Sequence, residues 1–136
     1  MRIINLFRTI SFMFLTVSCT ERQTRIELVG DDANYNLGEI KASESTLSGK
    51  EWLIQNKGNT YLRIDSVVAS CDCLTVSYDS INTVKPNGYF PFRVFPMPDG
   101  TLGTFYREIS IFGNFENSPL ILSLEGAFVE DESSIE

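Results

Sequence analysis

The chain has 136 residues, a hydrophobic fraction of 43% and a formal net charge of −7. This length suits one domain, and the apolar content is enough for a folded core, so an intrinsically disordered chain is not expected. The acidic charge argues against nucleic acid as a partner and against electrostatic attachment to an anionic membrane, because both need clusters of basic residues.

The first 18 residues have the features of a bacterial lipoprotein signal peptide. Arg2 and Arg8 supply positive charge, and the mostly apolar run from Thr9 to Val17 is too short to cross a bilayer. The run ends in LTVSC, which resembles the lipobox of bacterial lipoproteins, where the cysteine becomes the first mature residue and carries the lipid. Cys19 is therefore the predicted lipidation site. The alternative is an ordinary signal peptide followed by a free cysteine.

The rest of the chain is predicted to form strands. Residues 19–33 are polar and are expected to be a tether, with one short strand at 26–29. Later runs alternate apolar and polar residues, which is typical of half-buried β-strands. The predicted strands are 35–37, 50–56, 60–70, 71–78, 89–95, 104–112 and 119–128, with turn signals at 57–59, 85–88, 96–100 and 113–117. The cysteines at the start of 71–78 either begin that strand or form the bend that leads into it. The domain is expected to span 34–129, before an acidic tail at 130–136.

About seven short strands separated by turns predict an all-β domain, an antiparallel β-sandwich, with a small closed barrel as the alternative. Pro91 lies inside a predicted strand, so that strand is expected at a sheet edge or a bulge. The alternation that buries Phe105, Ile109 and Ile111 also points Arg107 inward. We expect the stem of Arg107 to lie along the core with its charged head at the rim.

Five sequence blocks occur in a recognisable order: YNLGEI at 35–40, an aromatic and Asn-x-Gly block at 52–64, SCDCL at 70–74, an alternating block at 103–111 and LSLEG at 122–126. Together these blocks resemble one family of Gram-negative envelope proteins, the domain-of-unknown-function 1573 family. Asp72 and Leu74 depart from the glycine and threonine of the family's Ser-Cys-Gly-Cys-Thr hallmark. The resemblance implies an immunoglobulin-like sandwich akin to the major sperm protein and ASPM–SPD-2–Hydin domains. It implies a place in the cell envelope and brings no known reaction.

Cys71 and Cys73 are the only cysteines besides Cys19. Residues two apart on an extended strand are about 6.6 Å apart, whereas bonded cysteines need their β-carbons about 3.8 Å apart. A disulfide therefore requires a bend at Asp72, and such a bond is expected to be easily reduced. The alternatives are two plain thiols, or a copper(I) site formed with Met97, the only methionine after the signal peptide.

No enzymatic activity and no cofactor are expected. The chain has no histidine to serve as a general base, and its aspartates are scattered near turns. The favoured function is a lipid-anchored, non-catalytic binding or assembly module for a protein or glycan partner in the envelope, with the periplasmic face favoured over the cell surface. The alternative is an envelope protein that handles thiols or copper through Cys71 and Cys73.

Overall fold

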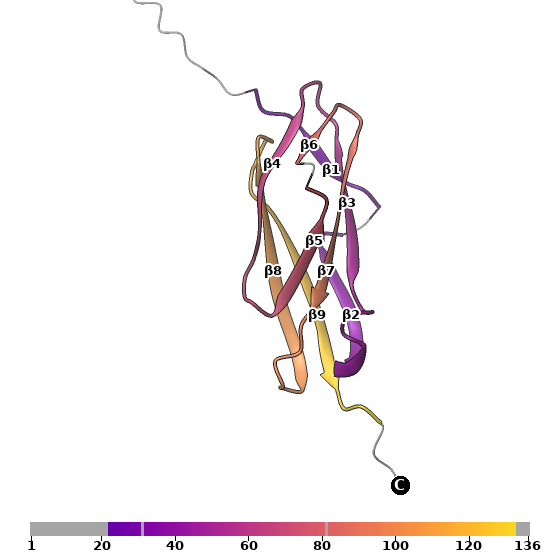
Figure 1. Cartoon of the computed structure of the whole chain (residues 1–136). Helices are drawn as coiled ribbons and strands as arrows, with labels where there is room; N and C mark the ends of the chain where they lie inside the picture. Colours follow the sequence, from indigo (N-terminus) through magenta and orange to yellow (C-terminus); the bar gives the residue numbers. More distant parts are fainter. Residues whose placement is uncertain (1–21, 31, 81, 133–136) are drawn as a thin grey trace, which may run out of the picture.

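The computed structural model describes residues 22–30, 32–80 and 82–132, which form two β-sheets packed face to face (Figure 1). The predicted signal peptide, Cys19 and the last four residues of the acidic tail lie outside the described residues. The strands are β1 (Ile26–Leu28), β2 (Asn34–Lys41), β3 (Lys50–Asn56), β4 (Leu62–Ala69), β5 (Leu74–Tyr78), β6 (Thr83–Val84), β7 (Tyr89–Pro96), β8 (Gly103–Gly113) and β9 (Leu120–Val129). One sheet has the order β1-β3-β7-β5 and the other β2-β9-β8-β4-β6. The predicted β-sandwich is confirmed.

The core lies between the two sheets and follows the alternation of the sequence. In β7, Phe90, Phe92 and Val94 point inward and are almost fully buried, while the residues between them are more exposed. Trp52 of β3 stacks on Phe92 with ring centroids 5.8 Å apart. The other sheet contributes branched residues from β8 and β9, which are Ile109, Ile111, Leu122 and Leu124. Large aromatic side chains from one sheet thus fill the space against branched aliphatic side chains from the other.

Each predicted strand coincides with a strand of the structure, with three differences. β6 has two residues and carries too little pattern to be seen in the sequence. A short 3₁₀ helix, η1, follows β2 at Ala42–Glu44. β2 pairs with β9 in parallel, so the sandwich is not wholly antiparallel. Within the described ranges, no helix is both long and apolar enough to span a bilayer.

Pro91 corrects one prediction, because its strand is central rather than at an edge. β7 lies between β3 and β5. Asn56 N donates to Gly88 O, so the even-numbered residues of β7 face β3 and Pro91 faces the β5 side. The last β5 pair is Tyr78 with Phe92, one residue short of Pro91. Proline is tolerated because the neighbouring strand has ended where its missing N–H would have been needed.

The predicted tether also needs correction, because the sandwich begins before residue 34. β1 pairs with β3, and Thr24 is buried although it precedes the first strand. The Thr24 hydroxyl donates to Asn56 Oδ1 at 2.6 Å, and Gly58 N donates to the same oxygen at 3.1 Å. Asn56 Nδ2 in turn donates to the carbonyls of Thr60 and Val84. One buried amide therefore joins the start of the domain to β3, to the turn after it and to β6.

Replacing Asn56 should destabilise the domain strongly. Asn56→Ala removes four hydrogen bonds and leaves the buried hydroxyl of Thr24 without its acceptor, so we expect a loss of about 3 kcal/mol in the free energy of unfolding. Urea denaturation followed by tryptophan fluorescence measures this, because Trp52 is the single tryptophan. The control is Asn36→Ala, whose amide is exposed and should cost under about 1 kcal/mol. Equal losses in both variants would contradict the role of Asn56.

A methyl group at position 58 should release the start of the domain. A β-carbon there would lie 1.8 Å from the Thr24 hydroxyl oxygen and 2.9 Å from Arg25 N. Gly58→Ala should therefore displace residues 24–25 and make the peptide bond after Arg25 a faster site for trypsin, measured by limited proteolysis. Asn59→Ala, an exposed change in the same turn, should leave the cleavage rate as it is. An unchanged rate in Gly58→Ala would mean that Thr24 is not held there.

Candidate functional site

The free edge of β5 is the part of the sandwich best placed to meet a partner. β5 ends the order β1-β3-β7-β5, so among the described residues only β7 pairs with it. Met97 N donates to Cys73 O, which means that odd-numbered residues of this segment face β7. The backbone N–H and C=O groups of Leu74, Val76 and Tyr78 therefore point away from the sheet. Within the described part of the chain, these groups make no hydrogen bond to another backbone group. A row of free N–H and C=O groups of this kind can pair with a strand from another chain.

The composition of β5 leaves this edge open. Its sequence, LTVSY, has no charged residue and no proline, the two features that usually block edge pairing. β1 has three residues with Glu27 at its centre, and β2 carries Glu39 and Lys41 beside a bulge. β4 is covered by β6 at Leu62 and Arg63. β6, the other end of the sheet that begins with β2, has only two residues, and the part of β4 beyond β6 begins with Asp65. β5 is thus the longest edge strand without a charged residue or a proline.

A hollow of about 460 Å³ lies at the C-terminal end of β5. Its lining is Tyr61, Asp79, Thr83, Val84, Lys85, Gly88, Tyr89, Phe90 and Pro91. Asp79 directly follows β5, and the Tyr78 ring packs on Phe90 with centroids 5.7 Å apart. Tyr61 is 63% exposed, Tyr89 is 51% exposed and Tyr78 is 44% exposed. Tyrosine is enriched at protein interfaces because its ring buries apolar area while its hydroxyl keeps a hydrogen bond.

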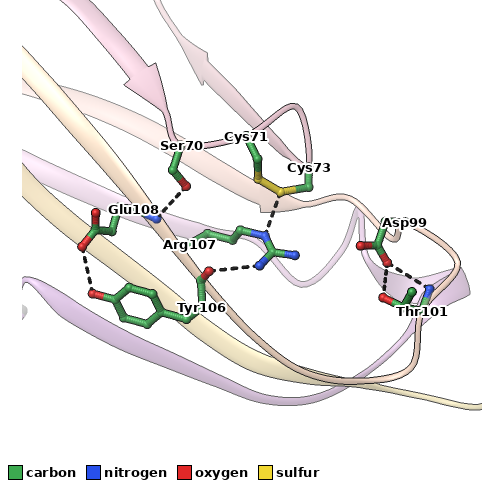
Figure 2. The surroundings of a disulfide bond; sticks show 8 residues. All are labelled: Ser70, Cys71, Cys73, Asp99, Thr101, Tyr106, Arg107 and Glu108. Carbon is green, nitrogen blue, oxygen red and sulfur yellow. Dashed lines mark hydrogen bonds between the residues drawn. A yellow bond between two sulfur atoms is a disulfide. The ribbon is translucent and has the colours of Figure 1, made fainter.

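The turn between β4 and β5 carries the two cysteines. The structure joins Cys71 and Cys73 by a disulfide (Figure 2), with their α-carbons 5.2 Å apart. Asp72, between them in the sequence, is exposed. The bend therefore precedes the strand, and β5 begins at Leu74. A loop of three residues removes little entropy from the unfolded chain, about 1.6 kcal/mol in the chain-entropy account, so the bond contributes less to stability than one closing a long loop.

A second hollow, of about 790 Å³, surrounds this disulfide. It is lined by Ser70, Cys71, Asp72, Cys73, Met97, Pro98, Asp99, Tyr106 and Arg107. Met97 is thus beside the cysteines, as a copper(I) site would require. The bonded sulfurs are not thiolates, however, and thiolates are the form that binds metal. Within the described ranges, no group of three or more Cys, Asp or Glu side chains is placed to hold a metal ion.

Arg107 contacts the disulfide directly. Its Nε lies 2.7 Å from Cys73 Sγ, and its Nη1 donates to Tyr106 O at 3.0 Å (Figure 2). The guanidinium also lies 5.8 Å from the centre of the Phe105 ring. Arg107 is half-buried, so its stem follows the core and its head reaches the rim, as the alternation predicts.

The carboxylates near Arg107 are engaged elsewhere. Glu108 accepts a hydrogen bond from the Tyr106 hydroxyl at 3.2 Å. Asp99 accepts from the Thr101 hydroxyl and from Thr101 N, and these bonds, followed by the charge of Arg107, hold the pKa of Asp99 below its usual value. Among the described residues, no carboxylate lies within ion-pair distance of Arg107.

The sequence identified some of these residues and missed others. The cysteines, Met97 and the inward phase of Arg107 were visible, and the structure brings all four into one hollow. The hollow with Tyr61 and Tyr89 was missed because these two tyrosines, and Tyr78 next to it, belong to three separate segments. The available signal was a tyrosine next to a turn in each case. The predicted lipidation site, Cys19, lies outside the described residues.

Comparison with solved structures shows relatives of the fold. A protein of unknown function from Porphyromonas gingivalis W83 aligns with 82% of this chain and 50% of its own, at 23% identity and a TM-score of 0.67. The E. coli chaperone DraB aligns over 84% of this chain and 58% of its own, at 8% identity and a TM-score of 0.50. WR4, a C. elegans MSP family member, aligns over 79% and 98%, at 11% identity and a TM-score of 0.44. The chain spans half the length of the Porphyromonas protein. The fold is an immunoglobulin-like β-sandwich.

Sequence comparison identifies the family. No curated protein matches the chain. The profile of the family described as "Protein of unknown function (DUF1573)" matches residues 28–128, from β1 to β9. Because this match takes in most of the sequence and nearly all of the sandwich, the chain belongs to the DUF1573 family.

Proposed function

We propose that this protein is a lipid-anchored, non-catalytic binding module of the Gram-negative cell envelope, facing the periplasm, and that it takes up an extended segment of a partner protein along β5. The free edge of β5, which leads into the tyrosine hollow, is the observation that carries this proposal. The family membership is consistent with a binding module, because the family is described without a reaction.

The amino-terminal sequence supports the anchor. Two arginines, a short apolar run and a cysteine within LTVSC are the features from which lipidation at Cys19 is inferred. Thr24, the first buried residue in the part of the chain that the structure describes, follows Cys19 by only five positions. The protein's net charge of −7 would oppose adsorption to anionic lipid, so acyl chains would have to hold it at the membrane.

Strand addition at β5 would supply the main-chain part of the interface. The outward N–H and C=O groups of Leu74, Val76 and Tyr78 offer hydrogen bonds to an extended peptide without disturbing the pairing of β5 with β7. In this mode of recognition, main-chain bonds provide affinity and side-chain pockets provide specificity.

The tyrosine hollow would supply the specificity. A partner segment that runs along β5 toward Asp79 reaches the hollow directly, where Tyr61 and Tyr89 offer aromatic surface. Asp79 and Lys85 add one charge of each sign at its rim. An apolar or aromatic side chain flanked by polar groups would therefore fit better than a strongly charged one.

Removing the proposed anchor should release the protein from the membrane. Cys19→Ser should move the protein from the membrane fraction to the soluble fraction or leave it as the unprocessed precursor, because the sulfur that would carry the lipid is gone. Mass spectrometry of the purified wild type should find residue 19 as the first residue, with added acyl mass. A wild-type protein with an unmodified first residue would contradict the proposal.

Blocking the β5 edge should abolish partner binding while the fold survives. Val76→Pro removes an outward-facing N–H and keeps the bonds that Thr75 and Ser77 make to β7, so the cost should be about 1–2 kcal/mol. A photo-crosslinking residue at Ser77 should trap a defined partner in whole cells, and Val76→Pro should lower the yield about tenfold.

The matched control is Ala69→Pro on β4. Ser70 N donates to Glu108 O, so in the part of β4 after the irregularity between Ile64 and Ser66 the backbone groups of Val67 and Ala69 point away from β8. Ala69→Pro therefore also removes an outward-facing N–H. Its crosslinking yield should stay close to that of the wild type. Absence of any crosslink at Ser77, or equal losses in both proline variants, would contradict binding at β5.

A further inference from the structure

The disulfide just before β5 adds little to the stability of the fold, and it is accessible to thiols. Cys71 and Cys73 are half-buried on an open hollow, with Asp72 exposed between them. A disulfide that closes so short a loop constrains the unfolded chain little. Strained or exposed disulfides are the ones that exchange with thiols, whereas structural disulfides resist reduction.

Arg107 makes the two sulfurs unequal. Its Nε is 2.7 Å from Cys73 Sγ, and no corresponding donor to Cys71 is found among the described residues. A sulfur in a disulfide is a weak hydrogen-bond acceptor, but a thiolate is a full negative charge. The guanidinium stays charged at all accessible pH values. Arg107 therefore stabilises Cys73 far more as a thiolate than as part of the disulfide.

We propose that the Cys71–Cys73 disulfide exchanges with the thiols of a partner dithiol, with attack at Cys71 and departure of Cys73. The incoming thiolate forms a bond to Cys71 Sγ as the Sγ–Sγ bond breaks, and the electron pair leaves on Cys73 Sγ beside Arg107. The second thiol of the partner, as its thiolate, then attacks the mixed disulfide and releases Cys71. The partner dithiol is oxidised to a disulfide, and Cys71 and Cys73 are reduced to two thiols.

The other charged groups at this hollow do not remove the difference between Cys71 and Cys73. Asp72 lies between the two cysteines in sequence and opposes thiolate formation at both. Asp99 faces the same hollow, with its carboxylate bonded to Thr101. Glu108 is held by Tyr106. Arg107 is thus the positive group that contacts a sulfur, and it contacts only one of the two.

This reaction is separate from the proposed binding at β5, and either can fail without the other. The test uses the purified full-length chain and reduced glutathione, followed by rapid quenching with N-ethylmaleimide. The tryptic peptide from Ile64 to Arg93 contains Cys71 and Cys73 without Cys19, and fragmentation at Asp72 assigns the label on each. Glutathione should be found on Cys71 and maleimide on Cys73, about tenfold over the reverse arrangement. Dithiothreitol, as a dithiol probe, should yield two protein thiols and one equivalent of its oxidised form.

Variants of Arg107 test the leaving-group role. Arg107→Met should slow the exchange about three- to tenfold and reduce the preference for Cys71, because the Cys73 thiolate loses its positive neighbour. Arg107→Lys keeps a charge and should restore part of the rate. Arg93→Met, which removes an exposed arginine from β7, is the control and should exchange like the wild type.

Three results would overturn the proposal. The first is a disulfide that resists both reagents in the folded protein. The second is an equal distribution of glutathione between the two cysteines. The third is an Arg107→Met variant that loses thermal stability but exchanges with wild-type rate and preference, which would make Arg107 a purely structural residue.

Discussion

The buried amide of Asn56 is the constraint on which the domain depends. It satisfies four hydrogen bonds at once, and its partners come from the segment before β1, from the turn after β3 and from β6. Because buried polar groups must be paired, these segments cannot shift independently of one another. The same region carries the backbone bonds between Asn56 and the Lys85–Gly88 turn, where Asn87 adopts a positive φ of 65°. That turn forms one wall of the tyrosine hollow, so the shape of the hollow follows from the packing around Asn56.

The sequence predicted the positions of the strands well, but it did not predict which strands lie next to each other in the sheets. Alternation revealed which residues of β7, β8 and β9 face the core, since period-two patterning reports burial of one face. Pro91 predicts a sheet edge or a bulge, because proline lacks the N–H that a ladder needs. In the structure, β5 ends before it would need the N–H that Pro91 lacks. Where a neighbouring strand ends cannot be read from the sequence around Pro91. Two other features also depend on contacts between residues far apart in the sequence: the parallel pairing of β2 with β9 and the packing of Thr24 on Asn56.

The candidate site could be predicted only where its chemistry is local. Two cysteines with one residue between them are visible in any sequence, and so is the inward phase of Arg107. The contact between Arg107 and Cys73 joins residues 34 positions apart and needs the sheets to be in place. The result is a strand with different features at its two ends: a disulfide beside a guanidinium before Leu74, and a hollow with exposed tyrosines after Tyr78. Binding and thiol exchange would therefore share β5 without sharing residues.

The short distance between Cys19 and Thr24 has a geometric consequence for a lipidated form. Five residues reach about 17 Å even when fully extended, so the end of the sandwich that holds Thr24 and Asn56 would stand close to the headgroups. The hollow with Tyr61 and Tyr89 lies at that end, whereas Arg107 lies six residues, or about 20 Å, along β8 from Gly113 at that end. A ligand for the hollow would then be met in the thin layer above the bilayer. Binding to a partner attached to the same leaflet would then be favoured over binding to a freely diffusing one, because attachment to one surface raises the effective concentration of the partner.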